Sequence, residues 1–278
     1  MNRIITYIRQ SLVDRYSVEE AKALSMLIWC DVLGLKAIDI YMGKDIILSE
    51  SKQREMENIV CRLQKNEPIQ YILGYAKFCG MSFCVAPGVL IPRPETAELV
   101  DLVVKENPSA LHLLDIGTGS GCIAISLDKR LSEANVDAWD ISEEALNIAR
   151  FNNLKLEANV SFSRQDVFAG GYNGELLYDV IVSNPPYITE MEKEEMDANV
   201  LEWEPEVALF VPTNDPLRFY RRIADLGRKY LSPQGRVYFE INQAYGQKMI
   251  EMMIEKQYHD VRLIKDMFGK DRILTAKK

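Results

Sequence analysis

Residues 110–121 read ALHLLDIGTGSG, a run of apolar residues that leads into three glycines at alternating positions. This pattern is typical of a buried strand that turns tightly into a helix, because glycine adopts positive φ at little cost. Alternating strand and helix patterns continue to the C-terminus, which predicts an α/β fold with an open, mostly parallel seven-stranded sheet and helices on both faces. The expected strands are 110–117, 135–140, 159–163, 178–183, 236–241, 261–264 and 272–276, and the expected helices are 121–131, 142–153, 217–231 and 244–256.

The first 73 residues show a different, helical periodicity. Ser17 followed by Glu20 resembles a capping box, Gly34 is expected to stop the helix that it opens, and another helix is expected over 51–65. Glycine and alternating aromatic residues over 74–86 indicate a hairpin. The sequence therefore predicts a helical domain over 1–73, a hairpin linker over 74–86 and a ligand-binding α/β domain over 87–278.

Composition and charge narrow the class of protein. The N-terminus MNRIITYIRQ lacks the apolar core of a signal peptide, so we expect a cytoplasmic protein with no membrane partner. The five cysteines contain no C-x-x-C pair, so neither a disulfide framework nor a metal site is expected. The net charge is −8, and the acidic excess follows residue 86, which argues against a nucleic-acid substrate because such binding relies on Lys and Arg.

The glycine loop and the two strands after it indicate an adenosyl site. The loop residues are Gly117, Thr118, Gly119, Ser120 and Gly121. Their G-x-G-x-G spacing differs from the dinucleotide fingerprint G-x-G-x-x-G, and a tight turn with no ligand is the alternative. Asp140 ends the next strand, where a carboxylate can accept hydrogen bonds from both ribose hydroxyls. After the third strand, Asp166 can accept the adenine amino group and Phe168 can pack on the purine.

These motifs in this order, DIGTGSG, WDIS, QDVF and then NPPY, resemble the class I S-adenosylmethionine-dependent methyltransferases. The resemblance covers roughly residues 86–278. It implies S-adenosylmethionine as cofactor, S-adenosylhomocysteine as product, and a planar nitrogen as the methyl acceptor.

The NPPY motif, residues 184–187, is the predicted catalytic device. The Asn184 side-chain oxygen and the Pro185 carbonyl can each accept one N–H of a substrate NH₂ group, which orients a nitrogen that is a poor nucleophile. Pro186 keeps Pro185 extended, and Tyr187 offers a ring against the planar amide. A stiff turn that only ends a strand is the alternative interpretation.

A second motif, LIPRPET over 90–96, carries a more specific resemblance. Together with EPIQYILG over 67–74 it resembles the release factor glutamine methyltransferases, the PrmC/HemK family, along the full chain. Members methylate the side-chain nitrogen of the glutamine in the Gly-Gly-Gln motif of peptide chain release factors. The resemblance implies that the helical domain docks the release factor. It also implies that residues 117–121, Asp140, Phe168 and Asn184 contact the cofactor, that 184–187 hold the glutamine, and that Arg93, Glu95 and Thr96 lie near the cofactor or the substrate entrance.

Alternatives remain at this point. Enzymes that methylate the exocyclic amines of DNA adenine or cytosine use the same NPPY motif. A homologue that acts on ribosomal protein glutamine would differ only in its N-terminal domain. A non-catalytic adenosyl-binding module and a dehydrogenase are disfavoured by the intact Asn184 and by the glycine spacing. LIPRPET could also be a stiff linker in which Glu95 caps the next helix. Val211-Pro212 and Asn242 depart from the family pattern.

Overall fold

The computed structural model describes residues 3–42, 46–169 and 176–278. Residues 1, 2 and 43–45 of the expected helical domain therefore lie outside the described part. The chain divides by its contacts into two compact units, Met1–Leu73 with Asp197–Trp203, and Gly74–Met196 with Glu204–Lys278. None of the helices in the described ranges is long and apolar enough to cross a membrane.

The first unit is helical, as the periodicity predicts. Its elements are α1 (Arg3–Leu12), α2 (Val18–Leu27), a π-helical turn (Ile28–Val32), α3 (Ala37–Tyr41), α4 (Glu50–Leu63), α5 (Ile69–Leu73) and α9 (Ala198–Trp203). Ser17 and Glu20 form the predicted capping box at the start of α2, because each side chain accepts the backbone N–H of the other residue. Buried apolar side chains, among them Ile5, Ile8 and Trp29, form the core of the unit.

The helix α9 is a late segment that belongs to the first unit. The Trp203 indole N–H donates to the carbonyl of Lys65 at 3.2 Å, and the Asn66 amide donates to Glu202 at 3.2 Å. Sequence periodicity does not predict this contact, because six residues are too few for an apolar stripe to be recognised.

The second unit contains the sheet. Its elements are β1 (Tyr75–Phe78), β2 (Met81–Cys84), α6 (Pro94–Glu106), β3 (His112–Ile116), α7 (Cys122–Arg130), β4 (Asn135–Asp140), α8 (Glu143–Lys155), β5 (Val160–Arg164), β6 (Tyr178–Ser183), β7 (Ile188–Thr189), a 3₁₀ turn (Glu190–Glu195), α10 (Glu206–Leu209), β8 (Phe210–Val211), α11 (Arg218–Tyr230), β9 (Leu231–Glu240), a 3₁₀ turn (Gln243–Tyr245), α12 (Gly246–Glu255), β10 (His259–Lys265) and β11 (Asp271–Lys277). The described strands of the main sheet follow the order β10-β11-β9-β6-β3-β4-β5. Pairings from β9 to β5 are parallel, and the two that involve β11 are antiparallel. The expectation of an open, mostly parallel seven-stranded sheet is confirmed.

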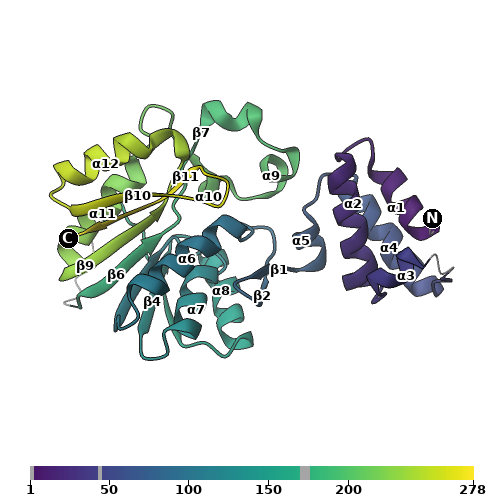
Figure 1. Cartoon of the computed structure of the whole chain (residues 1–278), viewed down its shortest axis with the longest axis horizontal. Coiled ribbons are helices and arrows are strands. Elements are labelled where there is room, and N and C mark those ends of the chain that lie inside the picture. Colours follow the sequence, from purple (N-terminus) through teal and green to yellow (C-terminus); the bar gives the residue numbers. More distant parts are fainter. Residues whose placement is uncertain (1–2, 43–45, 170–175) are drawn as a thin grey trace. The chain divides into compact units, whose positions relative to one another are not determined.

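Helices cover both faces of the sheet (Figure 1). Neighbouring residues of one strand point to opposite faces, so Leu113 packs in the core with α6 and α7 whereas Leu114 packs with α11 and α12. The hairpin β1–β2 belongs to this unit, since the Asn152 side chain of α8 bonds both the N–H and the carbonyl of Cys84, at 2.6 and 3.0 Å.

The segment between β6 and α11 was not predicted. It contains β7 and β8, which pair in parallel over two residues each, and the short helix α10. The expected strands and helices of this unit differ from the observed ones mainly at their ends, the largest difference being β9, which begins at Leu231 rather than at residue 236. The 13-residue helix α6 is not among the expected helices.

Candidate active site

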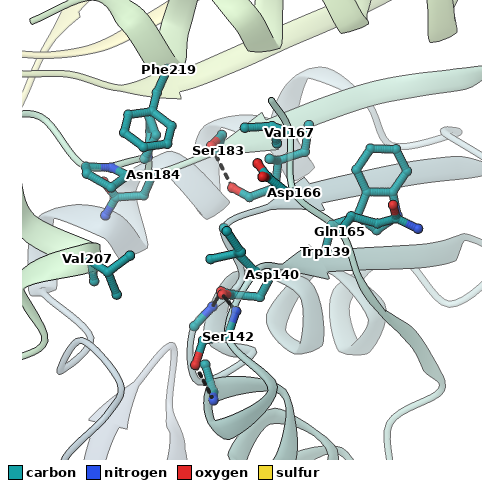
Figure 2. Close-up of a pocket in the computed structure, with 18 of the residues that line it drawn as sticks. Trp139, Asp140, Ser142, Gln165, Asp166, Val167, Ser183, Asn184, Val207 and Phe219 are labelled. Carbon is teal, nitrogen blue, oxygen red and sulfur yellow. Dashed lines mark hydrogen bonds between the residues drawn. The ribbon is translucent and has the colours of Figure 1, made fainter. Parts of the chain in front are cut away.

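The pocket lies at the carboxyl ends of β3, β4 and β6. A cavity of about 280 Å³ is lined there by residues from the glycine loop, from the segments that follow β4 and β5, and from the NPPY motif. Figure 2 shows Asp140, Asp166 and Asn184 around this hollow. Parallel strands bring their carboxyl ends to one edge of the sheet, so residues distant in sequence meet there.

The glycine loop approaches the cavity with its backbone. Gly117 and Gly119 line it with φ of 76° and 55°, and a Cβ on either would meet no atom within 4 Å. Gly121 has a different reason to be glycine. At its φ of 81° a Cβ would come within 3.0 Å of Ile125 and 3.2 Å of Ala149, so it permits the close packing of α7 on α8.

Thr118 and Ser120, the other two loop residues, stabilise the loop through hydrogen bonds to the surrounding protein. The Thr118 hydroxyl donates to the Asp115 carboxyl at 2.6 Å, and the Ser120 carbonyl accepts from the Asn152 amide at 2.9 Å. Thr118 and Ser120 are both buried and lie outside the cavity lining.

Asp140 lies at the end of β4 and anchors the loop. Its two carboxylate oxygens accept the backbone N–H groups of Gly119 at 2.8 Å and Ser142 at 2.9 Å. Each oxygen keeps a further lone pair with which to accept a hydroxyl. Burial raises the pKa of Asp140, and these backbone hydrogen bonds oppose that rise.

An aromatic pair forms the wall beyond β5. The Phe168 ring packs edge-on against Phe219 with centroids 5.1 Å apart, and the Arg218 guanidinium lies 4.6 Å from the Phe168 centroid. One carboxylate oxygen of Asp166 accepts the Phe168 N–H at 2.8 Å. These residues present flat apolar surface and a carboxylate to the same cavity.

Asn184, Pro185 and Pro186 line the cavity, and Tyr187 turns away from it. The Tyr187 hydroxyl donates to Glu240 at 3.2 Å, and its ring packs against the apolar core on the α11 side. The structure therefore places the ring of Tyr187 behind the motif.

The LIPRPET motif reaches the cavity at Leu90, and its later residues lie outside the cavity lining. Arg93 forms an ion pair with the buried carboxylate of Glu204, which also accepts the N–H of Ile91 at 3.0 Å. Glu95 lies in the first turn of α6 and provides no side-chain cap. Thr96 is buried and bonds Asn184 and Glu240. None of Arg93, Glu95 and Thr96 lines the cavity.

Sequence reasoning missed several residues of the site. Val207 lines the cavity from α10, a helix that the sequence does not predict, and Phe219 lines it from the expected helix α11. Asn242, noted as a departure from the family pattern, donates to the Tyr187 carbonyl at 3.3 Å and to Glu192 at 2.9 Å. Glu240 carried a signal in the sequence, because a carboxylate that directly follows the apolar run VYF of a central strand is a buried charge.

Comparisons with known proteins agree along the chain. Residues 3–74 match the PrmC N-terminal domain, and residues 95–202 match the Methyltransferase small domain. Release factor glutamine methyltransferase from Bacteroides thetaiotaomicron is 74% identical over 279 residues, 100% of both chains. The enzyme of that name from Flavobacterium psychrophilum is 41% identical over 273 residues, 96% of this chain and 95% of its own.

Among solved structures, a methyltransferase from Pyrococcus furiosus matches with a TM-score of 0.54 at 22% identity. The match covers 80% of this chain and 98% of that chain. At this identity the likeness shows a shared fold.

The Asp115 carboxyl makes the stability of the fold depend on pH. Burial raises its pKa from 3.8 to about 7. Because the folded pKa lies above the unfolded value, the free energy of unfolding is highest below about pH 4. It falls as pH rises, and the loss is complete once pH has passed through about 7. Between pH 5 and pH 8, the free energy of unfolding of the wild type should fall by about 2–3 kcal/mol relative to Asp115→Asn.

Urea unfolding of both proteins at the two pH values measures this difference. Parallel pH dependences for wild type and Asp115→Asn would show that Asp115 ionises normally in the folded protein.

Proposed function

The chain belongs to the release factor glutamine methyltransferases, and on that premise we propose that it methylates the glutamine side chain in the Gly-Gly-Gln motif of peptide chain release factors. The methyl donor in this proposal is S-adenosylmethionine. The observation that carries the proposal is that the glycine loop and the Asn184 side chain line one cavity. A cofactor held by the glycine loop would have its reacting end beside the Asn184 side chain. The proposed substrate acts in translation termination, which places the enzyme in the cytoplasm.

The residues on one side of the cavity fit an adenosyl group. Gly117 and Gly119 leave room where side chains would otherwise project, so a ligand can approach the backbone closely. Asp140 would accept the ribose hydroxyls, and Phe168 would cover one face of the adenine while Asp166 accepts its amino group. When bound, S-adenosylmethionine supplies a methyl group on a sulfonium, and S-adenosylhomocysteine is the product.

The residues on the other side suit a primary amide. The lone pair of an amide nitrogen is delocalised into the carbonyl, so the nitrogen must be oriented before it reacts. The Asn184 side-chain oxygen and the Pro185 carbonyl would each accept one N–H. Positive charge grows on the nitrogen during transfer, which strengthens both hydrogen bonds and stabilises the transition state more than the ground state.

The surroundings of the motif explain why it is rigid. Proline fixes φ at residues 185 and 186, and the Asn242 amide holds the carbonyl of Tyr187. Held in this way, the Pro185 carbonyl is presented at small entropic cost. The amide proton would leave to water once the nitrogen is methylated.

We further propose that the first unit docks the release factor. Its match to the PrmC N-terminal domain supports this role. An intact release factor should then be methylated with a lower KM than a short peptide that carries the Gly-Gly-Gln motif.

The role of Asn184 predicts a loss of rate without a loss of cofactor. Asn184→Ala removes one acceptor and should lower kcat by about 10²-fold or more, by analogy with the removal of one donor from an oxyanion hole. The dissociation constant of S-adenosylmethionine, measured by calorimetry, should change little. Asn147→Ala, at an exposed position of α8, is the matched control. An equal loss of cofactor affinity and rate would contradict the assignment.

Asp140 predicts the converse behaviour. Asp140→Ala removes the acceptor of two ribose hydroxyls, and hydrogen bonds to a charged group contribute about 1.5–3 kcal/mol each. The dissociation constant of S-adenosylmethionine should therefore rise at least about tenfold, while kcat at saturating cofactor falls less. Asp101→Ala provides a surface control, since Asp101 is exposed and pairs with Arg130. Unchanged calorimetric affinity in Asp140→Ala would exclude a ribose contact.

The substrate is tested by offering methyl-labelled cofactor to purified release factor, ribosomal protein and DNA in parallel. We expect label on the release factor. Label on ribosomal protein or on DNA alone would assign the same chemistry to a different substrate.

A further inference from the structure

A buried polar chain lies directly behind the Asn184 side chain. The Asn184 amide nitrogen is 3.3 Å from the Thr96 hydroxyl, and that hydroxyl is 2.6 Å from the Glu240 carboxylate. Thr96 and Glu240 are 2% and 1% exposed, and neither lines the cavity. Thr96 therefore contacts the cavity-lining Asn184 from the side away from the cavity.

Register explains why these three residues meet. Ser183 of β6 pairs with Phe239 of β9, so Asn184 and Glu240 leave their strands at the same level of the sheet. Thr96 reaches them from the first turns of α6, which begins at Pro94. The threonine of LIPRPET and the asparagine of NPPY are thus brought together by the fold.

Glu240 acts as an acceptor at both of its oxygens. One accepts the Thr96 hydroxyl and the other accepts the Tyr187 hydroxyl at 3.2 Å. Burial raises the pKa of Glu240, while the Thr96 hydrogen bond and the charge of Arg272 favour the ionised form. A separation of 2.6 Å is typical of a hydroxyl that donates to a charged carboxylate.

The hydrogen bonds around Glu240 set the direction of the next one. Its two oxygens accept the Thr96 and Tyr187 hydroxyls, and a threonine hydroxyl has one proton and two lone pairs. Because the Thr96 proton is directed to Glu240, the hydroxyl can only accept from Asn184. The NH₂ end of the Asn184 amide must therefore face Thr96.

This assignment settles the orientation of the amide. The two ends of an asparagine side chain are distinguished by the hydrogen bonds around them. With its nitrogen turned to Thr96, the opposite end of the amide, its oxygen, is turned to the cavity that Asn184 lines. An oxygen in that position is the acceptor that a substrate NH₂ requires.

We propose that Thr96 and Glu240 are positioning residues that hold the Asn184 amide with its oxygen toward the substrate. The proposal rests on the proposed function, in which Asn184 accepts an N–H of the glutamine. Without this chain the amide can turn over, and its NH₂ group would then face the NH₂ group of the substrate. Two donors cannot bond each other, so the turned state cannot hold the substrate nitrogen in the orientation that transfer requires.

The hydrogen bonds from Glu240 through Thr96 to Asn184 are called the relay below. Thr96→Val tests this relay, because valine keeps the shape of threonine and removes the hydroxyl. We expect kcat for the release factor to fall about tenfold, the effect of losing one oriented hydrogen bond. The calorimetric dissociation constant of S-adenosylmethionine should stay within about twofold of the wild type, because Thr96 lies outside the cavity lining. Thr96→Ser restores a hydroxyl and should restore most of kcat.

Thr275→Val is the matched control. The Thr275 hydroxyl is fully buried and has no hydrogen-bond partner among the described residues, so the same chemical change should leave kcat unaltered. Glu240→Gln is the second variant, used if Thr96→Val fails to fold. Its amide can donate to Thr96, which frees the Thr96 proton to bond the Asn184 oxygen, so kcat should again fall with cofactor affinity retained.

A double-mutant cycle separates positioning from general support. In an Asn184→Ala background, Thr96→Val should lower the residual rate by no more than about twofold, since there is no amide left to orient. Multiplicative losses, or a Thr96→Val rate equal to that of Thr275→Val, would overturn the relay.

The single variants distinguish the proposed role of Asn184 from the positioning role of Thr96 and Glu240. If Asn184→Ala keeps the wild-type rate, the proposed function of that residue fails and the relay fails with it. If Asn184→Ala is impaired while Thr96→Val and Glu240→Gln keep the wild-type rate, the relay alone is wrong.

Discussion

A hydrogen bond between two strand ends ties the halves of the site together. The Ser183 hydroxyl donates to the Ile116 carbonyl at 2.6 Å, and the two residues are also partners in the parallel pairing of β6 with β3. The glycine loop begins directly after Ile116 and the NPPY motif directly after Ser183. The distance between the cofactor side and the substrate side of the cavity is thus fixed by the sheet, where backbone hydrogen bonds leave little freedom.

The fold and part of the site could be predicted because their signals are local. Strand and helix periods, the glycine loop, Asp140 and Asn184 each follow from residue type at a strand end, and the sheet order then brings them to one edge. The region between β6 and α11 could not be predicted, because strands of two residues and helices of four to six carry no measurable period. Phe219 and Val207 reach the cavity from that region or from the helix after it.

The supporting contacts were harder still. Glu204 bonds Arg93 across 111 residues, and Thr96 bonds Glu240 across 144. Such pairs depend on how segments distant in sequence pack together, which no local pattern encodes. LIPRPET stands out only by resemblance, which implies that its arginine, glutamate and threonine lie near the cofactor or the substrate entrance. The structure gives its arginine and threonine supporting positions behind the cavity. A buried carboxylate such as Glu240 is costly unless its hydrogen bonds are satisfied, and here its two oxygens both accept hydroxyls.

One cavity joins a cofactor side to an amide-orienting side, and this arrangement leads to methylation of a glutamine nitrogen. Locating the transferred methyl group in the product tests this most directly. The full chain is incubated with isotope-labelled S-adenosylmethionine and either wild-type release factor or a factor in which the motif reads Gly-Gly-Glu, and the digested products are sequenced by tandem mass spectrometry. We expect a single labelled methyl group on the glutamine side chain of wild-type factor and none at that position in the glutamate variant. Label at another residue, or equal labelling of both factors, would contradict it.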